Sequence, residues 1–187
     1  MIRALSLAAV LALAGDALAA SFTLSDADKR AAIRAGERSV TAEGFDREWR
    51  VVNGGGETAL VVTPFHRLVV AARHAAFKSD PLKPTEVDRI LKEVDGRLVV
   101  WTYLRGRSEG FARFYVPRLM AGEREIKATF VQNERTAARQ EDGAYLARCV
   151  YGFPVRDLPP RSRVALVVAD ADGRDVSRFA IDLAGMR

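Results

Sequence analysis

The chain has 187 residues, of which 29 are Lys or Arg and 24 are Asp or Glu, so its formal net charge is +5. Apolar residues make up 49% and charged residues 28%, a composition that is typical of globular proteins and excludes a wholly disordered chain. The single cysteine excludes an intramolecular disulfide and any multi-cysteine metal site, and the two histidines exclude a three-histidine zinc centre, so we expect no metal or other cofactor.

Residues 1–19 have the pattern of a secretory signal peptide. Arg3 supplies a positive charge, and Ala4 to Gly15 is an apolar run that only Ser6 interrupts. Ala17-Leu18-Ala19 then provides the small residues of a cleavage site. The run is shorter than the roughly 20 residues of a membrane-spanning helix. We therefore predict cleavage after Ala19 and an exported protein, periplasmic or extracellular, with no transmembrane segment after signal removal; an uncleaved anchor is the alternative.

Three segments between residues 20 and 96 carry helix signals. Ser25 and Asp28 form a capping-box pattern ahead of the first segment. Thr63-Pro64 combines an N-cap residue with proline at the first helical position, and apolar residues then recur every three or four positions. The segments expected to be helical are 26–38, 64–77 and 85–94.

The other predicted elements are short strands. Trp49–Val52 and Thr58–Val62 flank Gly54-Gly55-Gly56, which predicts a hairpin. From Arg97 onward, apolar and polar residues alternate in short segments separated by turns such as Asp142-Gly143. These expected strands cover residues 98–104, 111–116, 125–132, 144–153, 163–169 and 176–183.

The order of these elements predicts an α+β fold. Short strands without helices between them are typical of an antiparallel β-sandwich or a barrel-like sheet. We expect this sheet in the C-terminal half, residues 97–187, after a helical N-terminal portion with one hairpin in residues 20–96. Residues 20–187 also have a length that suits one domain.

Gly106-Arg107-Ser108-Glu109-Gly110 matches the G-x-S-x-G pattern of serine hydrolases. In those enzymes the serine lies between a strand and a helix, and the catalytic histidine follows it in the chain. Here His66 and His74 both precede Ser108, and a second strand is predicted directly after the motif. We therefore interpret the motif as a hairpin turn and predict no catalytic residue.

The remaining metal and thiol motifs also have structural interpretations. A separation of eight residues places His66 and His74 about 12 Å apart along a helix, too far to share one metal ion, so we expect partly exposed side chains. Asp170–Asp175 lacks the glycine and glutamate positions of an EF-hand and is predicted to be a turn. Cys149 lies in an alternating strand, which favours a buried thiol over an exposed one that joins two copies.

The region after Arg97 interleaves aromatic residues with arginines. Such surfaces bind carbohydrate, phosphate or protein, because rings provide contact area and guanidinium groups bind anions in a bidentate manner. The competing interpretation places the rings in the core and the arginines at its rim. The candidate ligand or partner surface consists of Trp101, Tyr103, Arg105, Arg107, Arg113 and Tyr115.

The sequence predicts function only as a class. The leading hypothesis is a non-catalytic binding or accessory module of a bacterial-type cell envelope, whose partner is an envelope protein or an anionic polymer. Export argues against a nucleic-acid partner. The alternative is an envelope hydrolase with a carboxylate-only site drawn from Glu109, Glu123, Glu125 or Asp142. A third hypothesis is a subunit that is complete only in a hetero-complex.

Overall fold

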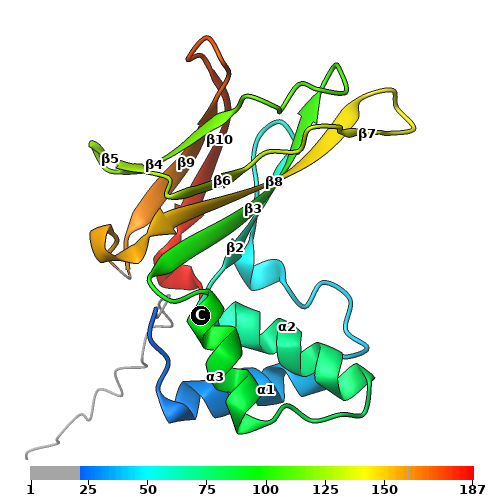
Figure 1. Cartoon of the computed structure of the whole chain (residues 1–187), viewed down its shortest axis with the longest axis vertical. Coiled ribbons are helices and arrows are strands. Elements are labelled where there is room, and N and C mark those ends of the chain that lie inside the picture. Colours follow the sequence, from blue (N-terminus) through cyan, green and yellow to red (C-terminus); the bar gives the residue numbers. More distant parts are fainter. Residues whose placement is uncertain (1–21, 160) are drawn as a thin grey trace, which may run out of the picture.

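The computed structural model describes residues 22–159 and 161–187, so the predicted signal peptide at residues 1–19 lies outside the described residues (Figure 1). Within the described residues the chain forms three α-helices and two antiparallel sheets, and neither sheet closes into a barrel. The predicted α+β class is therefore confirmed. None of the helices in the described residues combines the length and the hydrophobicity that a membrane span requires.

The first two helices begin at the capping residues that the sequence indicates, and the third begins at Pro84, one residue before the predicted start. Ser25 accepts a hydrogen bond from the backbone N–H of Asp28 at the start of the first helix, and Thr63 accepts one from His66 at the start of the second. Figure 1 shows the helices grouped at one end of the molecule. They are α1 (Asp26–Arg38), α2 (Pro64–Phe77) and α3 (Pro84–Glu93).

Gly36 allows α1 to lie directly against α2. A Cβ atom at this position would be 2.4 Å from the backbone oxygen of Val69 and 2.7 Å from the Cβ of Ala72. Both distances are well below van der Waals contact, so any larger residue would force the helices apart. The glycine therefore determines how closely these helices approach.

One sheet has six strands and contains the predicted hairpin. Its strand order is β1-β2-β3-β8-β6. The short strand β7 also pairs with β8, at the opposite end of β8 from β6. The pairing of β2 with β3 joins a strand from residues 20–96 to a strand from residues 97–187. The strands are β1 (Arg50–Val52), β2 (Thr58–Val62), β3 (Arg97–Gly106), β6 (Phe130–Gln132), β7 (Ala138–Arg139) and β8 (Tyr145–Pro154).

The second sheet has four strands in the order β10-β9-β4-β5. The predicted strand at 125–132 is wrong as a single element, because the chain leaves this sheet after β5 and enters the six-stranded sheet as β6. The strands of the second sheet are β4 (Val116–Ala121), β5 (Arg124–Lys127), β9 (Arg163–Ala169) and β10 (Asp175–Asp182).

The predicted strand at 111–116 is also wrong. The N–H of Arg113 donates to the backbone oxygen of Gly110, and the N–H of Tyr115 donates to that of Ala112, each at 3.1 Å. These bonds close successive turns, and the strand starts only at Val116. The G-x-S-x-G segment is consequently not a hairpin turn, because it belongs to the connection by which the chain crosses from one sheet to the other.

The buried sides of both sheets contribute to one hydrophobic core. Leu98, Val100 and Leu104 alternate along β3 with more exposed residues and are fully buried, as are Leu119 and Phe179 of the other sheet. The Cys149 thiol lies in the same core, where burial raises its pKa. The prediction of a buried thiol is therefore confirmed.

A polar cluster connects the β1–β2 hairpin with β10. The hydroxyl of Ser177 donates a 2.6 Å hydrogen bond to Glu57 Oε2, and the side-chain amide of Asn53 donates to both residues. Glu57 Oε1 also accepts from the backbone N–H of Arg105 at 2.9 Å. The Glu57 carboxylate therefore has structural partners on both sheets.

Candidate functional site

The side of the six-stranded sheet that faces away from the core carries an aromatic and apolar surface, here called the outer face. Directly opposed residues of antiparallel strands point to the same side. Trp101 of β3 is opposite Leu60 of β2 and Val150 of β8, and Tyr103 is opposite Arg148. By this register, the outer face comprises the apolar and aromatic side chains of Val52, Leu60, Val62, Val99, Trp101, Tyr103, Phe130, Ala138, Leu146, Val150 and Pro154, together with Arg50, Thr58, Arg97, Arg105, Gln132, Arg148 and Gly152.

The central ring of the outer face is accessible to a partner. Trp101 is 37% exposed, while Val52 and Phe130 at opposite edges of the sheet are 60% and 41% exposed. The guanidinium carbon of Arg148 lies 5.7 Å from the centroid of the Trp101 ring, a cation–π contact. The outer face therefore combines accessible rings and aliphatic side chains with a positive charge.

Arg105 lies on the same face, but its charge is balanced by Asp142. The Arg105 guanidinium forms an ion pair with the Asp142 carboxylate. A hydrogen bond from the backbone of Ala144, together with the bond from Arg105, holds the pKa of Asp142 below its usual value. A general acid requires the opposite shift, so this carboxyl is poorly suited to donate a proton.

The structure brings together only part of the surface predicted from sequence. Trp101, Tyr103 and Arg105 share the outer face, whereas Arg107 lies in an exposed bend after β3. Arg113 belongs to the turns of the crossover, where its guanidinium carbon is 5.5 Å from the Phe114 ring centroid. Tyr115 packs against the core, edge-on to Phe111 with ring centroids 5.7 Å apart, and burial raises its pKa.

A pocket of about 200 Å³ opens where α2 meets this surface, and we call it the His66 pocket. Leu60 and Trp101 belong both to its wall and to the outer face. Its lining is mainly apolar and comprises Phe45, Asp46, Leu60, Val62, His66, Arg67, Val70 and Trp101. Sequence reasoning did not find this pocket, because its lining comes from a loop, two strands and a helix.

His66 is the polar group buried in the wall of this pocket. Its side chain is almost fully buried at 3% exposure, and neither ring nitrogen has a hydrogen-bond partner among the described residues. The Trp49 ring lies beside it with centroids 4.7 Å apart. Burial lowers the pKa of His66 to about 4, so the imidazole is neutral near pH 7.

The expectation of a partly exposed His66 is therefore wrong, whereas His74 is exposed. His66 lies four residues before Val70 and shares its helix face, which lines the pocket beside the sheet. This spacing in the sequence indicates that His66 is buried, because a polar residue within an apolar stripe of a helix is expected to be buried.

The two charged groups in the pocket wall are paired within the protein. Asp46 accepts a 2.5 Å hydrogen bond from Arg50, and Arg67 donates a 2.9 Å bond to Glu93. Neither group needs a counter-charge from a ligand. The pocket is therefore suited to a neutral apolar group with one hydrogen-bonding atom.

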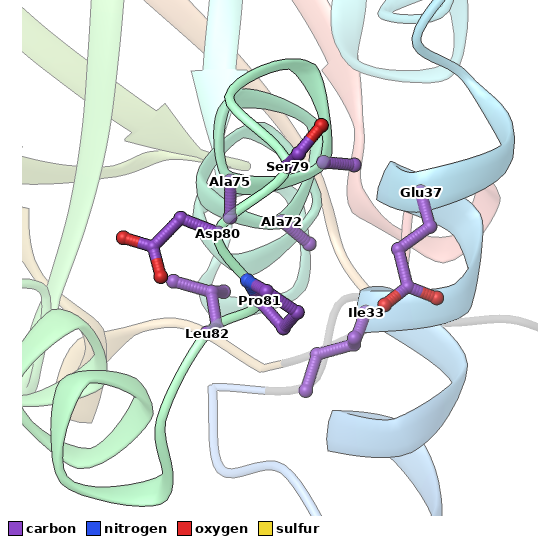
Figure 2. Close-up of a pocket in the computed structure, with 9 residues that line it drawn as sticks. Ile33, Glu37, Ala72, Ala75, Ser79, Asp80, Pro81 and Leu82 are labelled. Atoms are coloured by element: carbon purple, nitrogen blue, oxygen red, sulfur yellow. The ribbon is translucent and has the colours of Figure 1, made fainter.

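Two of the other pockets have fewer features that could recognise a ligand. One of about 250 Å³ lies between α1 and the end of α2, where Figure 2 shows Glu37 and Asp80 on opposite sides of Pro81. The other, of about 440 Å³, is formed by β4, β5 and β6. It contains the guanidinium of Arg118, which is already paired with Asp175.

The carboxylates proposed for a hydrolytic site lie on separate segments. Glu109 is in the crossover, Glu123 and Glu125 are in the β4–β5 hairpin, and Asp142 is in the turn before β8. All four are exposed. Within the described part of the chain, no group of three or more His, Cys, Asp or Glu side chains is arranged to hold a metal ion.

No family model matches the sequence, and no curated protein is similar to it. Among solved structures, a protein of unknown function from Burkholderia pseudomallei is similar over 88% of this chain and 100% of that chain, with 13% sequence identity and a TM-score of 0.44.

Proposed function

We propose that the protein is an exported, non-catalytic binding or accessory module of a bacterial-type cell envelope, and that it binds its partner through the outer face. In this proposal the two sheets form a β-sandwich that follows a helical N-terminal portion. The observation that carries the proposal is the accessible Trp101 in the middle of a sheet surface that combines apolar side chains with arginines. Aromatic residues and arginine are enriched at the sites where proteins bind other proteins.

The partner that fits this surface is an envelope protein with acidic residues around an apolar anchor. Rings such as Trp101 and Tyr103 provide contact area with little loss of conformational entropy. Arg148 adds a positive charge beside the central ring, which favours acidic groups in the partner. An anionic polymer would use the charge but would gain little from the aliphatic side chains of β2 and β8.

The local chemistry supports binding rather than catalysis. Ser108 is exposed in a bend, and both histidines precede it, in the helix that starts after Thr63. The pKa of Asp142 is shifted away from the range of a general acid. These features agree with a site that recognises a surface and performs no bond-breaking step.

Binding is tested by capturing partners from the native envelope with tagged residues 20–187, and then measuring the affinity of the purified partner. Trp101→Ala should weaken binding at least about 30-fold, since anchors of this kind contribute at least about 2 kcal/mol. Arg148→Ala should weaken binding at low salt and less at high salt, because ions screen its charge. The melting temperature of both variants should stay near that of the wild type.

Phe114→Ala is the matched control, because this ring is 67% exposed and lies in the crossover, outside the outer face. Its affinity should equal that of the wild type. Equal losses in the control and in Trp101→Ala, or no loss in Trp101→Ala, would overturn the proposed binding surface. Capture of an anionic polymer instead of a protein would correct the partner class.

Export is tested separately by N-terminal sequencing of the protein recovered from outside the cytoplasm. The sequence should begin at or next to Ala20, because Ala17-Leu18-Ala19 matches a cleavage site. Recovery of a protein that still begins with Met1 would contradict cleavage.

A further inference from the structure

The His66 pocket has the size of one aromatic ring. Its volume is about 200 Å³, and a cavity of about 150 Å³ is known to bind benzene in another protein. Most of its wall is hydrocarbon from Phe45, Leu60, Val62 and Val70. A single six-membered ring therefore fits its dimensions and its apolar character.

The wall of the pocket also includes a buried residue whose hydrogen-bonding atoms are unmatched. A neutral imidazole has one nitrogen that donates and one that accepts. In His66 both nitrogens are buried without a partner among the described residues. Because buried polar groups are almost always hydrogen-bonded, this imidazole is a candidate to bind a polar atom of a ligand.

The charged side chains around the pocket disfavour an ionic ligand. Asp46 is bonded to Arg50, and Arg67 is bonded to Glu93. A charged ligand would have to compete with these existing pairs. A hydroxyl group, in contrast, can donate to or accept from the His66 ring without any charge.

We propose that the His66 pocket receives the phenol ring of a tyrosine side chain from the protein that binds the outer face, with the hydroxyl bonded to His66. The inference rests on the proposed function, because Leu60 and Trp101 belong to both surfaces. The tyrosine ring replaces solvent in the apolar pocket, and its hydroxyl satisfies one nitrogen of the imidazole. The partner is therefore anchored at one end of the outer face.

The first test uses p-cresol and toluene, which reproduce the tyrosine and phenylalanine side chains and differ only in the hydroxyl. Binding is followed by NMR through the ring signals of the two histidines. Both probes should shift the His66 signals, and p-cresol should bind about tenfold more tightly because it makes the additional hydrogen bond. The exposed His74 is an internal control and should not shift.

Two variants measure separately how the hydrogen bond and the shape of the pocket contribute to the affinity for the probes. His66→Phe keeps a ring in the wall and should reduce the affinity for p-cresol to that for toluene. Val70→Phe should block both probes, because this half-buried residue lines the pocket and can lengthen without entering the core. Phe114→Ala should leave both affinities unchanged. Retention of the tenfold preference in His66→Phe would overturn the proposed hydrogen bond.

The outcomes also distinguish this inference from the proposed function. If neither probe shifts His66, or if the two bind equally, the phenol site is wrong, while loss of partner binding in Trp101→Ala would still support the outer face. If p-cresol binds but Val70→Phe captures the partner as well as the wild type does, the pocket is a phenol site that the partner does not use. Loss of capture in Val70→Phe, at an unchanged melting temperature, supports the tyrosine anchor.

Discussion

The indole Nε1 of Trp49 donates a 2.7 Å hydrogen bond to the backbone oxygen of Arg187, although the two residues are 138 positions apart. The hydroxyl of Thr63, which caps α2, donates to the same oxygen. The Glu48 carboxylate accepts from the Arg187 backbone N–H at 2.7 Å and from its side chain, at 2.9 and 3.1 Å from Nε and 2.7 Å from Nη2. These contacts hold together the segment before β1, the start of α2 and residue 187, and they position Trp49 against His66.

Glu48→Gln tests this cluster because it keeps the size of the side chain and removes its charge. The hydrogen bonds that the Arg187 side chain donates to Glu48 raise the pKa of Arg187, which shows that the carboxylate favours the charged guanidinium. We expect a loss of about 1 kcal/mol in the free energy of unfolding, since Arg187 is partly exposed and solvent weakens the pair. Urea unfolding measures this loss. Asp88→Asn, at a carboxylate 76% exposed, is the control and should change stability by less than about 0.5 kcal/mol.

Gly36→Ala should destabilise the protein by about 1–3 kcal/mol, because the added Cβ would overlap the backbone of α2. This loss should exceed the gain of about 0.8–1.0 kcal/mol that alanine brings to a helix. Gly54→Ala is the control, since nothing lies within 4 Å of a Cβ at that position. If thermal unfolding shows that Gly36→Ala is more stable than the wild type, the close contact between α1 and α2 is not present in solution.

Phe179→Ala should lower the free energy of unfolding by about 3–5 kcal/mol, because this ring is fully buried between the sheets. Arg178, its neighbour on β10, points to the other side and is exposed. Arg178→Ala should therefore change stability by less than about 0.5 kcal/mol. Denaturant melts of both variants provide the comparison, and similar losses would mean that the register of β10 is wrong.

His66 should make the free energy of unfolding depend on pH between about 4 and 6.5, mostly above the range in which carboxylates titrate. Burial lowers its pKa from 6.5 to about 4; Asp46 and Glu48 partly oppose this shift, and Arg67 adds to it. Between these values the unfolded chain binds a proton that the folded chain does not. The His66 contribution is therefore fully present above pH 6.5 and decreases as the pH falls toward 4, by up to about 3 kcal/mol.

The measurement is the free energy of unfolding of the wild type and two histidine variants at several pH values from 7 to 4.5. His66→Phe should remove most of the pH dependence and should keep or raise stability at pH 7, since it removes an unmatched polar group. His74→Gln changes an exposed histidine and should follow the wild-type curve. A His66→Phe curve as steep as that of the wild type would show that other groups cause the dependence.

The elements whose signals are local could be predicted from the amino-acid sequence. Ser25 and Thr63 mark helix starts because the bonds that they make lie within three residues, and the sequence contains all of that information. The hairpin around Gly54 and the buried position of Cys149 also follow from local patterns, a glycine turn and an alternation of period two. That Trp101 and Tyr103 lie on the same side of β3 follows from the same alternation, but the alternation does not decide whether that side faces the core.

Which strands pair, and which residues lie next to each surface, depends on long-range packing and could not be predicted from the sequence. Residues 111–115 form turns because the chain must cross from β3 in one sheet to β4 in the other, and no local pattern reveals that crossing. Tyr115 is consequently packed against the core, although its aromatic and arginine neighbours resemble those of Trp101. The His66 pocket depends in the same way on contacts between α2, β2 and β3. Such contacts are set by the packing of distant segments, whereas a sequence pattern reports only the periodicity of each segment.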